Sequence, residues 1–161
     1  LFEDTIENNI KFGKQNASHE EVVQAAKKAR CHEFIEALPE GYDTIIGEGG
    51  ASLSGGEKQR ISIARAMLKD ADIIIFDEAT ASIDPENEDK LKEAIESLTK
   101  NKTVIMIAHR LKTIRNADQI LVLKDGEIVE RGNHEELIKN NGLYSDLINA
   151  KAKAESWKLN N

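Results

Sequence analysis

Apolar residues recur at intervals of three and four positions along the first part of the chain. Between residues 18 and 38 they are Val22, Val23, Ala26, Ala29, Phe34, Ile35 and Leu38. Because a helical turn takes three to four residues, this spacing predicts amphipathic helices. Ser18 with Glu21 three positions later marks the start of the first. A further helix is predicted from about Gly55 to Lys69, after a glycine-rich loop.

The pattern changes after residue 70 to short β-branched and aliphatic runs. Ile73 to Phe76 and Thr103 to Ala108 predict strands, and the stretch from Pro85 to about Thr99 predicts a helix between them. A strand, helix, strand unit implies parallel strands covered by helices, since the connection must cross the face of the sheet. Met67 and Met106 are expected to lie in the core.

A hairpin is predicted near the end of the chain. Residues 119–123 and 127–130 are strand-like, and Asp125-Gly126 between them is a strong turn signal. Asn133, with Glu136 three positions later, starts another helix, and residues 143–154 continue helically. The sequence therefore predicts one α/β domain with two parts, a helical part over residues 1–69 and an α/β part over residues 70–161.

Composition narrows the class of protein. The chain has 161 residues and a net charge of -7, with acidic and basic residues interspersed, so nucleic acid is not an expected partner. The single cysteine, Cys31, has no partner for an internal disulfide, which fits a reducing compartment. Aliphatic and aromatic runs such as Ile73 to Phe76 are far short of the roughly 20 residues that span a bilayer. Any membrane association is therefore expected to be indirect. The chain begins at Leu1 and reads as a fragment.

The segment from Leu53 to Arg60 joins a loop to the predicted helix. Ser54 and Glu57 are placed to form a capping box. Gly55 and Gly56 each cost about 1 kcal/mol relative to alanine in a helix, and capping alone does not require them. An open helix N-terminus is suited to an anion such as a terminal phosphate. The alternative is a purely structural turn.

Carboxylates follow the first strand of the α/β part. Asp77 and Glu78 come directly after Ile73 to Phe76, and ligands bind beyond the carboxyl ends of strands in open α/β sheets. Asp77 is a candidate ligand of Mg²⁺, and Glu78 a candidate to polarise water that attacks a γ-phosphate. The alternative is that one of them caps the next turn. Asp84 before Pro85 reads as a helix cap, with a second role open near a nucleotide or a partner subunit.

A histidine follows the second strand. His109 comes after Thr103 to Ala108, so it is expected at the same rim of the sheet as Asp77 and Glu78. There it would hold a γ-phosphate oxygen or the attacking water, although a lone histidine is more often structural. The hypothesis is that these three side chains converge on one terminal phosphoryl group.

Four motifs in order resemble those of the ATP-binding cassette (ABC) family: Leu53–Arg60 its signature motif, Ile73–Glu78 its Walker B, Ser82–Asp84 its D-loop and His109 its switch histidine. The loop over residues 41–50 is similar to the exporter loop that faces the transmembrane domains. The resemblance implies part of a P-loop NTPase (RecA-like) core with a helical signature subdomain.

Two family features are absent from the sequence: the phosphate-binding Walker A pattern, Gly-x-x-x-x-Gly-Lys-Ser/Thr, and the glutamine of the Q-loop. In the family two cassettes face head to tail. The resemblance implies that the turn from Ser54 to Glu57 binds ATP held by the other cassette. Asp77, Glu78 and His109 would serve ATP in their own cassette, with Asp84 near the shared interface. We expect the isolated chain to have no appreciable ATPase activity and its sheet to have an exposed edge.

The function that the resemblance implies is that of an ATP-binding and hydrolysing module of an exporter at the cytoplasmic face of a membrane. ATP and Mg²⁺ would be its cofactors. Its partners would be a second cassette, in a homodimer or heterodimer, and transmembrane domains. Two alternatives remain: an ABC-type ATPase acting on chromosomes or ribosomes, and a non-catalytic cassette. The exporter-like loop and the acidic charge argue against the first, and the intact Asp77, Glu78 and His109 against the second.

Overall fold

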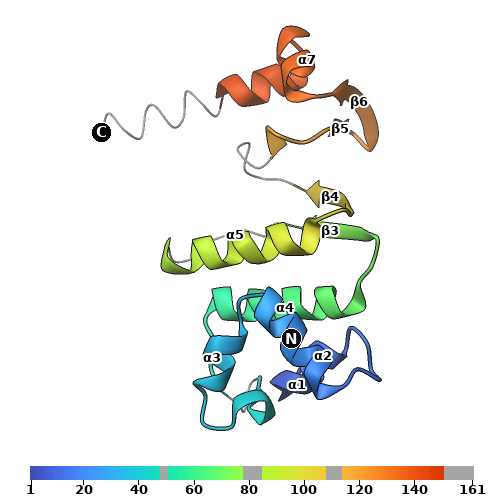
Figure 1. The fold of residues 1–161 in the computed structure, drawn as a ribbon. Coiled ribbons are helices and arrows are strands. Elements are labelled where there is room, and N and C mark those ends of the chain that lie inside the picture. Colours follow the sequence, from blue (N-terminus) through green and yellow to red (C-terminus); the bar gives the residue numbers. More distant parts are fainter. Residues whose placement is uncertain (48–50, 78–84, 108–113, 151–161) are drawn as a thin grey trace, which may run out of the picture. The chain divides into compact units, whose positions relative to one another are not determined.

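The computed structural model describes residues 1–47, 51–77, 85–107 and 114–150, with side chains from residue 89 onward in the third range. Figure 1 shows the elements in chain order. The chain divides into two compact units, Leu1–Ile105 and Met106–Asn161. This boundary falls inside the second of the two parts expected from the sequence.

Short helices make up most of residues 1–69. They are α1 (Ile6–Lys11), α2 (His19–Lys28), α3 (His32–Glu36), a 3-10 turn η1 (Gly41–Asp43) and α4 (Gly55–Lys69). The predicted helices between residues 18 and 38 are confirmed as α2 and α3, and α2 begins with the predicted capping box of Ser18 and Glu21. The chain turns between them through Arg30 at a φ of 55°. α4 has the predicted bounds.

α4 is the helix around which the first unit is built. It contacts α1, α2 and α5 (Pro85–Thr99). Its buried residues recur every three to four positions, as one face of a helix must: Gly56, Arg60, Ile61, Ile63 and Ala64. After α1 the chain passes so close to α4 that a Cβ at Gly13 would overlap the carbonyl oxygen of Arg65. Gly13 is therefore required by this close approach.

A small antiparallel sheet was not predicted. β1 (Asp4–Thr5) pairs with β2 (Ile45–Ile46), Asp4 opposite Ile46 and Thr5 opposite Ile45. Buried Asn9 supports this region, since its side chain hydrogen-bonds to both backbone groups of Phe2. The sheet joins the start of the chain to the loop that precedes α4.

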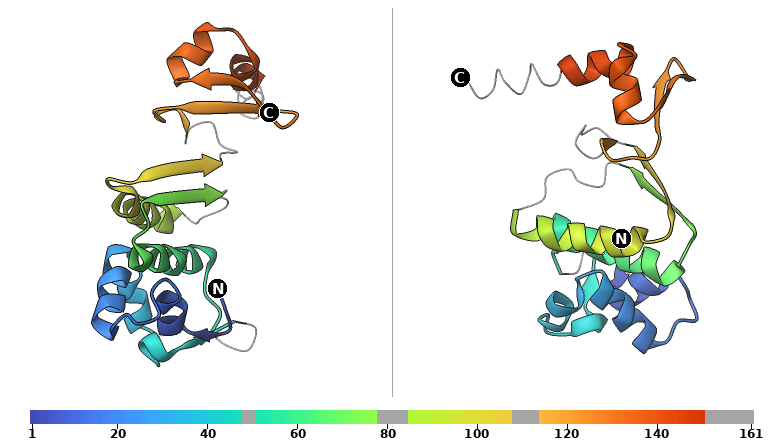
Figure 2. Two further views of the ribbon diagram at one scale, coloured as in Figure 1. Left: turned by 90° about the vertical axis from the view of Figure 1, so that its right-hand side faces the viewer. Right: turned by 45° about the horizontal axis from the view of Figure 1, so that its top comes forward.

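β3 (Ile73–Asp77) and β4 (Thr103–Ile107) form the predicted strand pair. Their arrows point the same way in Figure 2, as the crossover through α5 requires. The backbone N–H of Thr103 donates to the carbonyl of Asp72 at 3.0 Å, which joins the two strands at their starts. The predicted strand, helix, strand unit is confirmed.

The two faces of β3 differ in burial. Ile74 and Phe76 are each 8% exposed and belong to the core, whereas Ile73 and Ile75 on the other face are 57% and 66% exposed. Every residue of β4 is exposed. Met106 is 39% exposed, so its expected place in the core is wrong, while Met67 packs against the core as expected. Met106 lies on a strand that the described residues leave uncovered.

The second unit contains the predicted hairpin. β5 (Ile120–Lys124) pairs antiparallel with β6 (Glu127–Gly132), and both turn residues, Asp125 and Gly126, have positive φ, as a two-residue turn of this kind requires. α7 (His134–Lys139) starts at its predicted cap, and residues 143–150 are helical. A small core holds this unit together: Ile120, Val122, Leu137 and Tyr144.

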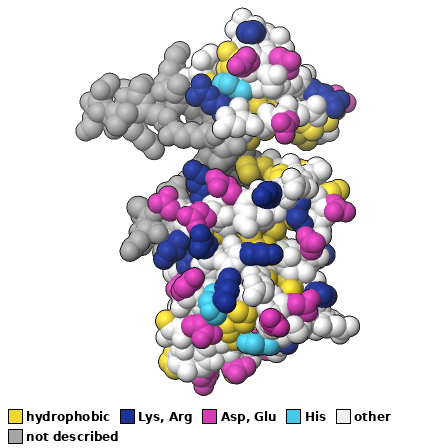
Figure 3. All heavy atoms as spheres, viewed as in Figure 1, with side chains coloured by type: hydrophobic (Ala, Val, Ile, Leu, Met, Phe, Trp, Pro, Cys, Tyr) yellow, Lys and Arg dark blue, Asp and Glu magenta, His cyan; other side chains and the backbone are white. Residues whose placement is uncertain are grey.

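The surface carries both signs of charge. On the face drawn in Figure 3, Lys and Arg side chains are interspersed with Asp and Glu. None of the helices in the described ranges is long and apolar enough to cross a bilayer.

Candidate functional site

The N-terminal turn of α4 carries four of the predicted site residues. Ser54 is the N-cap, with a φ of -63° and a ψ of 160°. Its hydroxyl accepts a hydrogen bond from the Glu57 N–H at 3.3 Å, and its own N–H donates to the Glu57 carboxylate at 2.7 Å. The predicted capping box is thus present. The Lys58 N–H donates to the Ser54 carbonyl at 3.0 Å and closes the first helical turn.

The same turn leaves donors available. A helix cannot provide acceptors for its first N–H groups, and the capping box supplies acceptors for those of Ser54 and Glu57 only. Among the described residues, no acceptor lies within hydrogen-bond reach of the Gly55 or Gly56 N–H. The Ser54 hydroxyl, used there as an acceptor, keeps its proton for donation. Three donors therefore lie in one turn, which is the arrangement that binds anions at helix N-termini.

Gly55 has open space around it. A Cβ at this position would meet no atom within 4 Å, and its φ is not positive. Nothing within the described chain therefore requires glycine, although glycine weakens a helix by about 1 kcal/mol relative to alanine. Ser54 and Gly55 are exposed, while Gly56 is buried. Glycine at this position therefore leaves open space beside the turn as far as the described residues show.

A buried cation lies behind the turn. Arg60 is 3% exposed, and its guanidinium lies over the ring of Phe34 at 5.2 Å from the ring centre. Burial lowers the pKa of Arg60, and the negative charge of Glu57 acts in the opposite direction. From the sequence, Arg60 is expected only as a member of the motif. Its spacing of four from Gly56 and from Ala64 is the signal that places it on the buried face.

Asp77 is the last residue of β3, as predicted, and its side chain is exposed. A carboxylate oxygen is the donor type that Mg²⁺ takes, and Mg²⁺ is commonly held by one or two carboxylates together with substrate phosphates. Asp77 fits that role. Within the described ranges, no group of three or more His, Cys, Asp or Glu side chains is arranged to hold a metal. Glu78, Asp84 and His109 lie outside the described residues.

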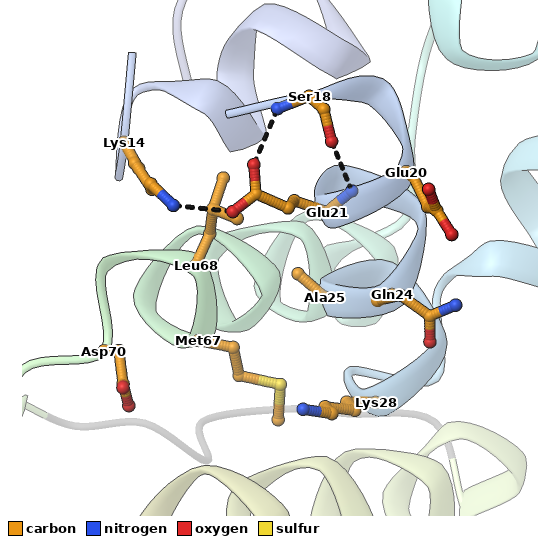
Figure 4. Close-up of a pocket in the computed structure, with 10 residues that line it drawn as sticks. All are labelled: Lys14, Ser18, Glu20, Glu21, Gln24, Ala25, Lys28, Met67, Leu68 and Asp70. Carbon is orange, nitrogen blue, oxygen red and sulfur yellow. Dashed lines mark hydrogen bonds and ion pairs between the residues drawn. The ribbon is translucent and has the colours of Figure 1, made fainter. Parts of the chain in front are cut away.

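A surface groove between α2 and α4 is separate from these residues. It is lined by side chains that include Lys14, Ser18, Glu21 and Met67, and by none of the predicted site residues (Figure 4). Glu21 completes the capping box of α2 there and also binds Lys14 at 2.5 Å. α2 and α4 thus begin with the same box in two different surroundings.

Comparison with known proteins agrees with the motifs. The family described as ABC transporter matches residues 2–81. A solved structure of a bacterial Atm1-family ABC exporter with ATP bound superposes with a TM-score of 0.82 at 46% identity, over 94% of this chain and 27% of that one.

Curated relatives point the same way. The chain is 58% identical over 147 residues to an ATP-dependent lipid A-core flippase of Syntrophus aciditrophicus, covering 91% of this chain and 24% of the relative. It is 52% identical over 150 residues to a β-(1→2)glucan export ATP-binding/permease protein of Brucella melitensis, covering 93% and 25%. The chain thus spans about a quarter of the length of these relatives. On its motifs, its fold and these likenesses, the chain belongs to the ABC transporter family, and it is similar to exporters of that family.

Proposed function

We propose that this chain is part of the ATP-binding and hydrolysing module of an ABC exporter, in which ATP closes a pair of cassettes and hydrolysis reopens it. The observation that carries the proposal is the first turn of α4. There the Ser54 hydroxyl and the N–H groups of Gly55 and Gly56 are three hydrogen-bond donors in one turn, and no described contact requires glycine at position 55. The relatives with export and flippase names support the transport assignment.

In this proposal the turn from Ser54 to Gly56 binds the terminal phosphate of ATP that the other cassette holds. The donors of this turn need no rearrangement to meet an anion, since the capping box already fixes them. Glu57 belongs to the same nucleotide-facing turn. The second cassette, identical or different, is therefore a required partner.

Asp77 is proposed to hold Mg²⁺ for ATP bound in its own cassette, with Glu78 polarising the attacking water. His109 would hold a γ-phosphate oxygen or that water, and Asp84 would lie near the interface of the two cassettes. Bound Mg²⁺ supplies positive charge against the phosphate oxygens. Asp77 is the member of this group that the structure describes, at the carboxyl end of a strand where such ligands bind.

Membrane association is proposed to be indirect, through transmembrane domains of the full-length protein, with this module at the cytoplasmic face.

The test is ATP turnover by the full-length protein with Mg²⁺. Replacing Glu78 with Gln should leave ATP binding intact and abolish turnover, because the amide cannot act as a base. Glu127→Gln, on the exposed hairpin, is the matched control and should turn over ATP like the unsubstituted protein. Unchanged turnover in Glu78→Gln would remove Glu78 from its role.

The isolated chain offers a second test. Purified residues 1–161 should show no appreciable Mg²⁺-dependent ATPase activity, since the sequence contains no Walker A pattern. Turnover by this chain would contradict the proposed division of the site between residues inside and outside it.

A further inference from the structure

We infer that Glu57 is a positioning residue, which acts on the nucleotide through Ser54 and the two glycines rather than by touching it. The inference rests on the proposed function and adds a role to that same site. The Glu57 side chain is already engaged within its own chain, because its carboxylate accepts the Ser54 N–H at 2.7 Å.

This contact decides which donors of the turn remain available. Glu57 binds one N–H with its side chain, and its own N–H is bound by the Ser54 hydroxyl at 3.3 Å. The remaining donors are the Ser54 hydroxyl proton and the N–H groups of Gly55 and Gly56. Without the Glu57 carboxylate, the Ser54 N–H loses its acceptor, and the extended conformation of Ser54 that orients its hydroxyl against the two glycine N–H groups is held less firmly.

The charge of Glu57 opposes phosphate binding, so its benefit must come from geometry. A carboxylate at a helix N-terminus is favourable for the helix and repels an incoming anion. The buried Arg60 cation lies three positions further along α4, and its charge interacts with that of Glu57. The turn thereby gains the cap while part of the repulsion is offset.

The structure provides a matched control in α2. Ser18 and Glu21 form the same box, with the Ser18 N–H donating to Glu21 at 2.8 Å and the Glu21 N–H donating to the Ser18 hydroxyl at 3.2 Å (Figure 4). No glycine follows Ser18, where His19 and Glu20 occupy the first turn. Loss of either capping box should lower the stability of the protein by a similar amount. Only loss of the capping box of α4 should change the KM for ATP.

The experiment measures kcat and KM for ATP in the full-length protein, with thermal unfolding alongside. Glu57→Ala should raise the KM by about fivefold, the factor that corresponds to losing one helix cap. Glu57→Gln keeps an oxygen at the same reach and should stay within about twofold of the unsubstituted protein. Glu57→Asp keeps the charge but falls short of the Ser54 N–H, so it should resemble Glu57→Ala. Glu21→Ala should lower the melting temperature as much as Glu57→Ala does, and it should leave the KM for ATP unchanged.

Several results would overturn the inference. An unchanged KM in Glu57→Ala would do so, as would an equal rise in Glu21→Ala, which would reduce the effect to stability. Poor function of Glu57→Gln with normal function of Glu57→Asp would show that charge matters and not reach. If Glu57→Ala does not fold, the Glu57→Gln and Glu57→Asp variants still show whether the length of the side chain or its charge determines the KM. Absence of turnover in the unsubstituted protein would contradict the proposed function itself, and the inference with it.

Discussion

The helices of residues 1–69 and the strand pair β3–β4 belong to the same unit for most of their length, but they differ in how far their apolar residues are buried. The helices bury theirs against one another, and Ile6, Ile10, Val22, Ile35 and Ile61 are all 0% exposed. The strands bury one face of β3 and leave Ile73, Ile75 and the apolar residues of β4 exposed. The buried residues of the helices thus share one core with α5 and one face of β3. The other face of the sheet presents a surface that the described residues do not cover.

The largest expected effect tests this contrast with two isoleucines. Ile10→Ala, in the core of the helical region, should lower the free energy of unfolding of the chain by about 2–5 kcal/mol, because it leaves a cavity. Ile75→Ala, at 66% exposure, should change it by less than about 0.5 kcal/mol. Denaturant unfolding followed by circular dichroism measures both. Equal losses would mean that the sheet face is covered in the isolated chain.

A second comparison uses two glycines that differ in the space around them. Gly13→Ala should destabilise the chain by about 1–3 kcal/mol, since the new methyl group would overlap the Arg65 carbonyl. Gly55→Ala should leave thermal stability equal or slightly higher, because its methyl group would meet nothing. If Gly55→Ala is the more destabilising of the two in a thermal melt, the assignment of Gly55 to an external contact loses its basis.

A smaller effect should appear in acid, within the helical region. Burial tends to raise the pKa of Glu7, but its bonds to Lys11 and His19 outweigh this, and the pKa lies below the ordinary 4.5. Glu7 therefore adds stability that is present above about pH 4.5 and is lost as the pH falls through its folded-state pKa. Glu7→Gln should flatten this part of the stability profile. Glu135→Gln, outside the helical region, should leave the profile as it is.

The fold was predictable where local signals were strong. Caps and glycine turns placed α4, α5 and the β5–β6 hairpin, and the capping boxes of α2 and α7 followed from residues three apart. β1 and β2 were missed because each has two residues and forms only by pairing about forty positions along the chain. α1 was missed because it is short, although Thr5 before Ile6 and Ile10 is the signal of its start.

The candidate site was predictable in part. The turn from Ser54 to Glu57 has the expected conformation, since a capping box is specified by neighbouring residues. The burial of Arg60 was not expected, because arginine is mostly exposed in proteins, although its spacing of four from Gly56 and Ala64 indicates the buried face of the helix. The hypothesis that Asp77, Glu78 and His109 converge stays a prediction, because two of the three lie outside the described residues.

Binding of the terminal phosphoryl group by the first turn of α4 is measured most directly by photocleavage of the full-length protein trapped with Mg²⁺, ATP and vanadate, which takes the place of that group. If the first turn of α4 binds that group, ultraviolet light should cut the backbone at Ser54 or the adjacent glycines, and mass spectrometry should find fragments ending there. Trapping with cleavage confined to other parts of the protein would show that this turn does not bind the terminal phosphoryl group.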